Sequence, residues 1–360
     1  MIKFKNFIGI SSMLIMFFAP GKLKGQNTLI THDAGNVMNG EAPSLAQDNK
    51  KVYLAFASGD SIFFSYSGKK EEKFSAPIFV GLLKGLVNVG GRGPKILSNK
   101  DQLLIAAPDT SGNFSSWLQT KPGKSWERGA RINDVKNIAK EGFLSLASNN
   151  NGHFFAVWLD LRNGKKNNIY GARSVDAGKS WRKNQLIYRS PGGSVCECCK
   201  PSVVMKDQLV AIMFRNNLKG NRDLYLIQSK DGGKTFGTAQ KLGEESWALN
   251  GCPMDGGGLM IENNDAIQTV WQRKGNVYSC EQGKKELFVA KGRQGVIAGM
   301  NGIYYIAFVN KGKLYLRGAR NEIVELGGVT GYPEMLAIDA STILCTWENE
   351  HSIQHVFLHN

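Results

Sequence analysis

The chain has 360 residues, of which 42 are glycine, and a formal net charge of +15. This length and glycine content suit one large all-β domain. The lysines are spread through predicted turns, such as Lys69-Lys70 and Lys165-Lys166, and do not form one stripe interleaved with aromatic residues. We therefore expect no nucleic-acid partner, although the positive charge favours acidic glycans or anionic surfaces.

Residues 1–25 are expected to be a signal peptide. Lys3 and Lys5 precede an apolar stretch from Phe7 to Ala19, and small residues around Gly25 suggest cleavage there. The stretch of 13 residues is shorter than the roughly 20 needed to span a bilayer, and no later run is long enough to stop transfer. An N-terminal anchor is the alternative. We expect an exported protein, periplasmic or extracellular, with no transmembrane segment and a mature charge of +11 after loss of four lysines.

The mature chain, residues 26–360, is expected to form a single β-propeller domain. Short strands recur as four per unit, and units begin near seven positions: Pro43, Pro94, Leu144, Pro201, Pro253, Gly295 and Pro333. The last unit has three evident strands, so we expect the strand at residues 28–32 to complete it and close the ring. Seven blades are favoured. Six blades are the alternative, because no turn motif follows residue 293.

Two turn motifs repeat 55 residues apart. Ser174 to Trp181 and Ser229 to Phe236 share the pattern Ser-x-Asp-x-Gly-x-Ser/Thr-aromatic, and degenerate copies occur at residues 119–126 and 67–74. In such a turn the aspartate accepts backbone N–H bonds, the glycine takes a positive φ, and the aromatic ring packs back under the blade. We expect these turns on one rim, opposite the loops that enter the inner strands and those that join second to third strands.

Charged residues of both signs collect in the loops of that other rim, which makes it the predicted functional face. The two turn motifs, together with the Arg-x-Pro segment (Arg92 to Pro94) on the functional face, resemble the Asp boxes and the Arg-x-Pro segment of the sialidase, or neuraminidase, superfamily. A group of exported bacterial sialidase-like proteins, labelled BNR-repeat, is more similar still. The shared segments are Trp158 to Arg162, Cys196 to Cys199, Arg215 with Arg222-Asp223, and Trp247 with Gly251 to Asp255.

The resemblance implies arginines that bind a substrate carboxylate, a tyrosine nucleophile with a glutamate beside it, and an aspartate acid/base. Planar guanidinium groups suit this task because each binds a carboxylate through two parallel hydrogen bonds. Arg92 matches the family's Arg-x-Pro arginine, although Gly93 replaces the family's isoleucine. The further candidates for the clamp are Arg162, Arg215 and Arg273. Tyr332 with Glu334 is the nucleophile candidate, in a loop that opens a seventh unit which the six-bladed enzymes lack.

Asp160 and Glu141 are the candidates for the acid/base. As paired carboxylates they would also suit hydrolysis by two acids, one with a raised pKa and one ionised. An ion pair between Asp160 and Arg162 is the structural alternative, because the two residues stand two positions apart.

Four cysteines fall in two neighbouring entry loops: Cys196, Cys198, Cys199 and Cys252. Disulfides are the leading interpretation for an exported protein, with the pairing open. The alternatives are a copper or zinc site, with Met254 as a further donor, and a redox role. Apart from that metal we expect no cofactor. Cys280 and Cys345 are interpreted as small buried residues in strands.

The sequence therefore predicts a sialidase-like propeller, expected to be a monomer, that acts on or binds acidic glycans. Exo-sialidase-type glycoside hydrolysis is the sharpest form of this hypothesis. The alternative is a non-catalytic binding or accessory propeller whose cysteines are structural or hold a metal.

Overall fold

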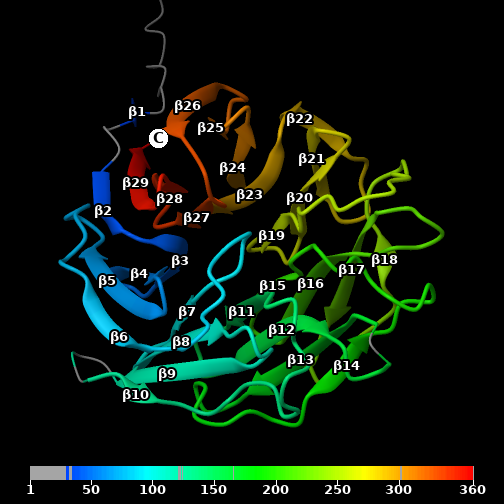
Figure 1. The fold of residues 1–360 in the computed structure, drawn as a ribbon. Helices are drawn as coiled ribbons and strands as arrows, with labels where there is room; N and C mark the ends of the chain where they lie inside the picture. Colours follow the sequence, from blue (N-terminus) through cyan, green and yellow to red (C-terminus); the bar gives the residue numbers. More distant parts are fainter. Residues whose placement is uncertain are drawn as a thin grey trace, which may run out of the picture.

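The computed structural model describes residues 30–31, 35–120, 123, 125–164, 166–300 and 302–359. The predicted signal peptide lies outside these residues. The described residues form strands, turns and loops, and they include no helix that is long and apolar enough to cross a membrane. Seven antiparallel sheets stand around a central axis (Figure 1), which confirms the seven-bladed propeller.

The first four blades have four strands each. Blade 1 consists of β3 (Glu41–Gln47), β4 (Lys51–Ser58), β5 (Ser61–Gly68) and β6 (Ile78–Leu82). Blade 2 consists of β7 (Lys95–Ser98), β8 (Gln102–Pro108), β9 (Phe114–Thr120) and β10 (Glu127–Arg128). Blade 3 consists of β11 (Leu144–Ser148), β12 (Phe154–Asp160), β13 (Asn168–Ser174) and β14 (Gln185–Tyr188). Blade 4 consists of β15 (Ser202–Lys206), β16 (Leu209–Arg215), β17 (Leu224–Ser229) and β18 (Gln240–Lys241).

The last three blades bring the chain back to its start. Blade 5 consists of β19 (Gly258–Ile261), β20 (Ile267–Arg273), β21 (Asn276–Glu281) and β22 (Leu287–Lys291). Blade 6 consists of β23 (Arg293–Met300), β24 (Ile303–Asn310), β25 (Lys313–Arg317) and β26 (Ile323–Gly328). Blade 7 consists of β27 (Glu334–Ala337), β28 (Thr342–Asn349) and β29 (Ser352–His359), completed by β1 (Ile30–Thr31) and β2 (Gly35–Asn39).

The ring closes where both ends of the chain meet. β1 and β2 each pair antiparallel with β29, so blade 7 receives its outer edge from the N-terminal part of the chain. β1 lies inside the strand predicted at residues 28–32, and β2 extends the closure beyond that prediction. Closure stabilises the ring because it covers a sheet edge with backbone hydrogen bonds.

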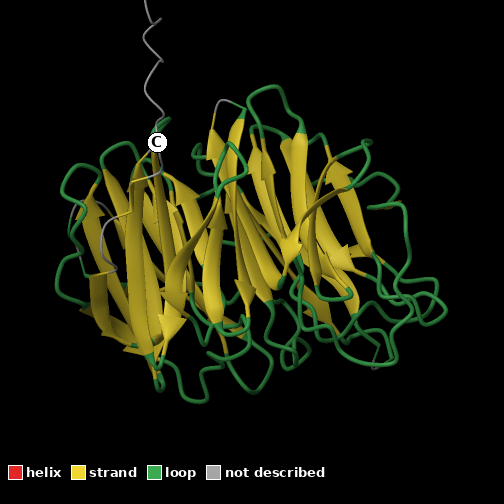
Figure 2. Ribbon diagram, turned by 90° about the horizontal axis from the view of Figure 1, so that it is seen from above, coloured by secondary structure: helices red, strands yellow, loops and turns green. Residues whose placement is uncertain are grey.

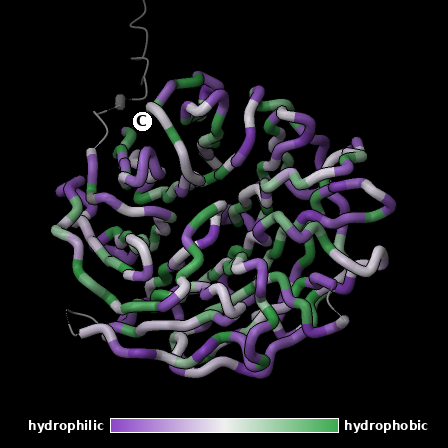
Figure 3. Tube along the Cα trace, viewed as in Figure 1, coloured by the Kyte–Doolittle hydropathy of each residue, from purple (hydrophilic) through white to green (hydrophobic). Residues whose placement is uncertain are grey.

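The core lies between the blades and not in one central mass. Second strands such as β12 are buried along their whole length, because each packs against the blades on both sides. Hydrophobic residues accordingly recur around the entire ring (Figure 3). Turned by 90°, the molecule shows strands running between two rims of loops (Figure 2).

The two Asp-box turns have the predicted geometry. Asp231 Oδ1 accepts the backbone N–H of Thr235 at 2.9 Å, and the Ser229 hydroxyl accepts that of Gly233 at 2.9 Å. Phe236 packs edge-on against Phe155 of the preceding blade, with 5.7 Å between ring centroids. Both turns join third to fourth strands, which places them on the rim opposite the inner-strand entry loops. The ring of Phe236 therefore packs blade 4 against blade 3.

Replacing Gly178 with alanine is expected to destabilise the protein by about 1–3 kcal/mol. Gly178 has a φ of +84°, and a Cβ there would collide with Leu104 of the preceding blade. Gly283→Ala is the control, because Gly283 has a φ of +78° and no atom within 4 Å of the added Cβ. Urea unfolding of both variants separates the collision from backbone strain. Equal losses would show that Gly178 does not set the spacing between blades.

Candidate functional site

A cleft opens at the centre of the entry-loop rim. It has a volume of about 360 Å³ and lies over a central channel of about 400 Å³ that the inner strands line. Lys95, Lys200 and Glu334 line both, so the cleft is the mouth of the channel. The charged residues of the cleft are four cations and two carboxylates, namely Arg92, Lys95, Lys200, Arg293, Glu334 and Glu348.

Arg92 lines the cleft, and neighbouring groups hold its guanidinium group. Its Nε donates to the carbonyl of Glu141 at 2.5 Å, its Nη1 donates to the carbonyl of Val89 at 3.4 Å, and the group stacks 4.0 Å from the centre of the Phe143 ring. Burial lowers the pKa of Arg92, an effect that Glu141 and Tyr332 partly oppose. Within the described part of the chain Nη2 makes no hydrogen bond. The side chain is thus fixed and still has a donor to offer a ligand.

Tyr332 and Glu334 line the same cleft as Arg92. The Tyr332 hydroxyl donates to the Met254 carbonyl at 3.0 Å, and burial raises the pKa of this phenol. Glu334 lies 3.1 Å from Lys95 Nζ and 3.9 Å from Lys200 Nζ. Burial alone would raise the pKa of Glu334, but the two lysines outweigh it and lower the pKa overall. At neutral pH the cleft therefore holds a neutral phenol beside an ionised, paired carboxylate.

Lys200 has an unusually low pKa for a lysine. Burial and the nearby charge of Lys95 lower its pKa to about 8, and Glu334 offsets only part of this effect. Its ammonium group is therefore protonated at neutral pH and loses its charge a little above it. A lysine of this kind can switch the charge of the cleft within an ordinary pH range.

The other three arginines proposed for the clamp do not line this cleft. The three guanidinium nitrogens of Arg215 donate to the carbonyls of Asp255, Arg222 and Gln272, at 3.0, 2.6 and 2.9 Å. Arg273 is paired with Glu286 and stacks on Tyr278. Arg162 bonds to Asp160, Asp134 and Asn184. The structure gives each of these arginines its own set of protein partners and does not bring them to a common carboxylate site.

The two candidates for the acid/base also have structural partners. Asp160 is fully buried, and both of its oxygens accept hydrogen bonds from the Arg162 guanidinium at 2.9 Å. The indole N–H of Trp158 also donates to Asp160, at 2.8 Å. This is the ion pair that the sequence offered as the structural alternative. The Glu141 carboxylate accepts from Asn167 at 3.3 Å, while its carbonyl orients Arg92.

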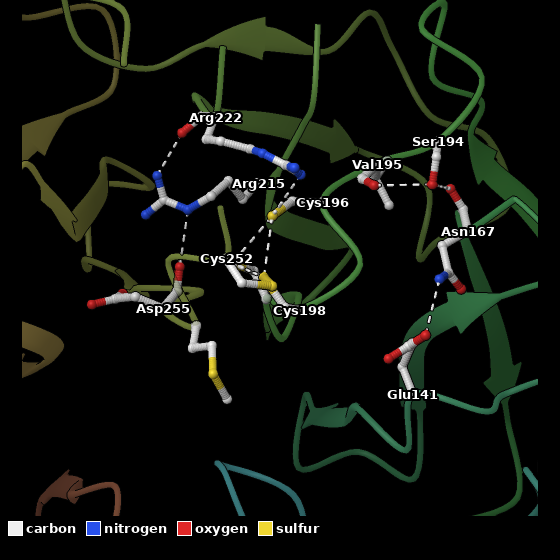
Figure 4. Close-up of a disulfide and its surroundings, with 12 residues drawn as sticks. Glu141, Asn167, Ser194, Val195, Cys196, Cys198, Arg215, Arg222, Cys252 and Asp255 are labelled. Atoms are coloured by element: carbon white, nitrogen blue, oxygen red, sulfur yellow. Dashed lines mark hydrogen bonds between the residues drawn. A yellow bond between two sulfur atoms is a disulfide. The ribbon is translucent and has the colours of Figure 1, made fainter. Parts of the chain in front are cut away.

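The cysteines cluster beside the cleft, in the entry loops of blades 4 and 5 (Figure 4). Cys198 and Cys252 form a disulfide with 6.0 Å between their Cα atoms, which confirms the expectation of a disulfide. Disulfides are typical of oxidising, exported compartments. Cys196 and Cys199 are free and buried, with their sulfurs 3.5 Å apart. The Cys199 contact, aided by Arg222 and Arg215, lowers the pKa of Cys196 to about 6, whereas burial raises that of Cys199.

Five charged or amide residues of the cleft were not predicted from the sequence: Asn88, Lys95, Lys200, Arg293 and Gln294. A signal for the two lysines was present, because Lys95 follows Pro94 and Lys200 precedes Pro201 at the entrances of two inner strands. Glu334 follows Pro333 in the same way. Residues beside these prolines begin the inner strands, whose first side chains surround the mouth of the channel.

No protein-family model matches this chain, and a search of curated proteins finds no match. Solved structures do match in fold. A protein of unknown function from Dyadobacter fermentans DSM 18053 has a TM-score of 0.56 at 14% identity, covering 93% of this chain and 100% of its own. An ulvan lyase of polysaccharide lyase family PL25, solved with -[GlcA(1-4)Rha3S]- bound, has a TM-score of 0.56 at 10% identity, with coverages of 91% and 95%.

Virginiamycin B lyase from Staphylococcus aureus has a TM-score of 0.53 at 11% identity and covers 92% of this chain and 100% of its own. At these identities the likeness extends to the fold alone, and the resemblance to sialidases stays a prediction. Two of these three structures are named as lyases, and the third has an unknown function.

Proposed function

We propose that this protein is a glycan-binding propeller whose rim cleft holds a carboxylated sugar residue. The observation that carries the proposal is the excess of cations in the cleft: Arg92, Lys95, Lys200 and Arg293 face two carboxylates. One of these carboxylates, Glu334, already pairs with Lys95 and lies near Lys200. A positive potential thus remains near Arg92 and the exposed Arg293.

The size and composition of the cleft also suit a sugar. Its volume of about 360 Å³ falls in the range of roughly 300–1,000 Å³ found for small-molecule sites. Tyr332 contributes a ring and a hydroxyl, and Asn88 and Gln294 contribute amides that can bond sugar hydroxyls. The ulvan lyase is one propeller whose bound glycan contains an acidic sugar. This structure supports the proposal because a similar fold holds an acidic glycan. It does not identify the binding residues of this chain.

The second candidate function is hydrolysis of that glycan, and one observation favours it. Tyr332 and Glu334 line one cleft with Arg92, as a tyrosine nucleophile, its glutamate and a carboxylate-binding arginine would. The present contacts do not yet form that machinery, because the Tyr332 hydroxyl donates to a backbone carbonyl and Glu334 is paired with Lys95. Binding is therefore the function that the geometry supports best.

Calorimetric titration tests the proposal. The mature protein is titrated with N-acetylneuraminate and with a glucuronate-containing disaccharide, each beside a neutral analogue in which the carboxylate is reduced to an alcohol. We expect saturable binding of at least one acid and a clear loss for its alcohol. Equal affinities within both pairs would overturn the proposal. A fluorogenic sialoside, assayed with wild type and Tyr332→Phe, tests the hydrolysis candidate separately.

Binding of the acidic sugar is expected to weaken about tenfold between pH 7 and pH 9.5. The reason is that Lys200, with a pKa of about 8, is a cation below this pH and neutral above it. Glu334, whose pKa is lowered by the lysines beside it, keeps its negative charge over this range. In Lys200→Arg the residue at this position stays charged, so the decline should disappear. A decline of the same size in both proteins would rule out Lys200 as its origin.

A further inference from the structure

The sulfurs of Cys196, Cys198 and Cys199 form a compact triangle. None of these three residues lines the cleft that the proposed function uses. The Sγ atoms are 3.7 Å apart between Cys196 and Cys198, 3.5 Å between Cys196 and Cys199, and 4.0 Å between Cys198 and Cys199. A point equidistant from all three lies about 2.2 Å from each, close to the metal–thiolate distance of about 2.3 Å for zinc. An ion near the plane of the triangle would reach all three sulfurs.

Two arginines lie beside the buried sulfurs, where they can balance negative charge. Cys196 and Cys199 are 0% and 1% exposed. Nη1 of Arg222 lies 3.5 Å from the sulfur of Cys196, and Arg215 lies close by (Figure 4). Three thiolates around one cation leave a net negative charge, which the two guanidinium groups would balance. The donor set consists of soft sulfur ligands, which select soft cations.

The disulfide occupies one corner of the sulfur triangle. Cys198 is bonded to Cys252, so in the oxidised protein one corner of the triangle is not a thiolate. Cys252 is exposed, whereas Cys196 and Cys199 are buried, so a reductant meets the disulfide from the Cys252 side. We propose that the cysteine cluster is a binding site for a soft d¹⁰ cation, Cu(I) or Zn(II), which opens when the Cys198–Cys252 disulfide is reduced.

The opening step requires an external dithiol. One thiolate of the dithiol attacks the Cys252 sulfur and breaks the bond to Cys198, which leaves as a thiolate. The second thiol of the dithiol then attacks the mixed disulfide, and Cys252 leaves as a thiol while the dithiol becomes a disulfide. Two electrons pass from the dithiol to the protein. Cys198 then joins Cys196 and Cys199 as a third thiolate, and their protons go to solvent when the cation binds.

The test uses the whole mature protein, prepared anaerobically in an oxidised and a dithiol-reduced form. Thiol titration in denaturant should give four free thiols before reduction and six after it, since the structure holds one disulfide and four free cysteines. Zn(II) and Cu(I) are each titrated against a chromogenic chelator. We expect one equivalent of at least one ion in the reduced form and binding at least about 100-fold weaker in the oxidised form. Which ion binds more tightly identifies the cation.

Variants test the ligands and the control by the disulfide. Cys252→Ala cannot form the disulfide and should bind the cation without reductant. Cys199→Ala should bind at least about 100-fold more weakly even when reduced, and Cys196→Ser provides a second ligand variant whose folding is checked by circular dichroism. Cys280→Ala removes a buried free cysteine elsewhere and should bind as wild type does. Absence of binding in the reduced protein, equal binding in both redox forms, or full binding by Cys199→Ala would overturn the proposal.

Discussion

Arg92→Gln is expected to weaken binding of an acidic sugar by about 1.5–3 kcal/mol, which corresponds to roughly 10- to 150-fold in Kd. Arg92 lines the cleft and is held by the Glu141 carbonyl and the Phe143 ring, and its Nη2 makes no hydrogen bond within the described part of the chain. Glutamine keeps much of the side-chain length but loses the charge and the paired donors that suit a carboxylate. Calorimetric titration of the variant with the acid and its alcohol analogue measures the effect.

The control is Arg320→Gln. Arg320 is exposed in the turn between β25 and β26, on the opposite rim, and its replacement removes the same charge from the protein. This variant should bind the acid as wild type does. A similar loss in both variants would show that the effect is one of overall charge and not of the cleft. An unchanged affinity in Arg92→Gln would remove Arg92 from the proposed site.

Asp160→Ala is expected to lower the free energy of unfolding by about 3–5 kcal/mol. Asp160 is fully buried and accepts bonds from Trp158 and from the backbone and guanidinium of Arg162. Without Asp160, the mostly buried guanidinium of Arg162 keeps Asp134 and Asn184 as hydrogen-bond partners. The indole N–H of Trp158 loses its acceptor. Urea unfolding at pH 7 measures the loss.

Asp134→Ala gives the matched comparison, because Asp134 pairs with the same arginine but its side chain is 34% exposed. Asp134→Ala should lower the free energy of unfolding by less than Asp160→Ala does. The two roles considered for Asp160 give opposite results: a structural residue changes stability and leaves sugar binding by the folded protein intact, whereas a catalytic acid changes turnover and leaves stability intact. Full stability in Asp160→Ala would contradict the structural role.

Local turn chemistry made the fold predictable. The Asp boxes depend on residues within one turn, and the entry prolines mark inner strands, so the sequence predicted seven units whose starts agree with the inner strands of the structure. β2 was not predicted, because its residues Gly35–Asn39 include glycine and asparagine, which are depleted in strands. That segment is a strand because it pairs with β29 from the other end of the chain.

The candidate site was predictable only in part, for a physical reason. Propeller topology assigns a loop to a rim, but it does not say where a long side chain points. Arg215 does not line the cleft, because its guanidinium group donates hydrogen bonds to carbonyls of blade 5 and its entry loop. Arg273 turns toward Glu286 at the entrance of β22. These partners are set by packing between and within blades, which spacing along the chain does not reveal.

The pairing of the cysteines could not be predicted from the sequence either. Four cysteines in two loops allow three pairings, and the choice of Cys198 with Cys252 depends on how the entry loops of blades 4 and 5 meet. What the sequence did indicate was their proximity, since adjacent entry loops lie on one rim. The three-sulfur triangle follows from that proximity together with the compact Cys196 to Cys199 loop.

A crystal structure of residues 26–360 with the acidic sugar from the titrations tests the central claim most directly. The account predicts the sugar in the rim cleft, with its carboxylate within hydrogen-bond distance of Arg92 and its hydroxyls toward Tyr332. A sugar held between blades or on the Asp-box rim, with the cleft left to solvent, would contradict it.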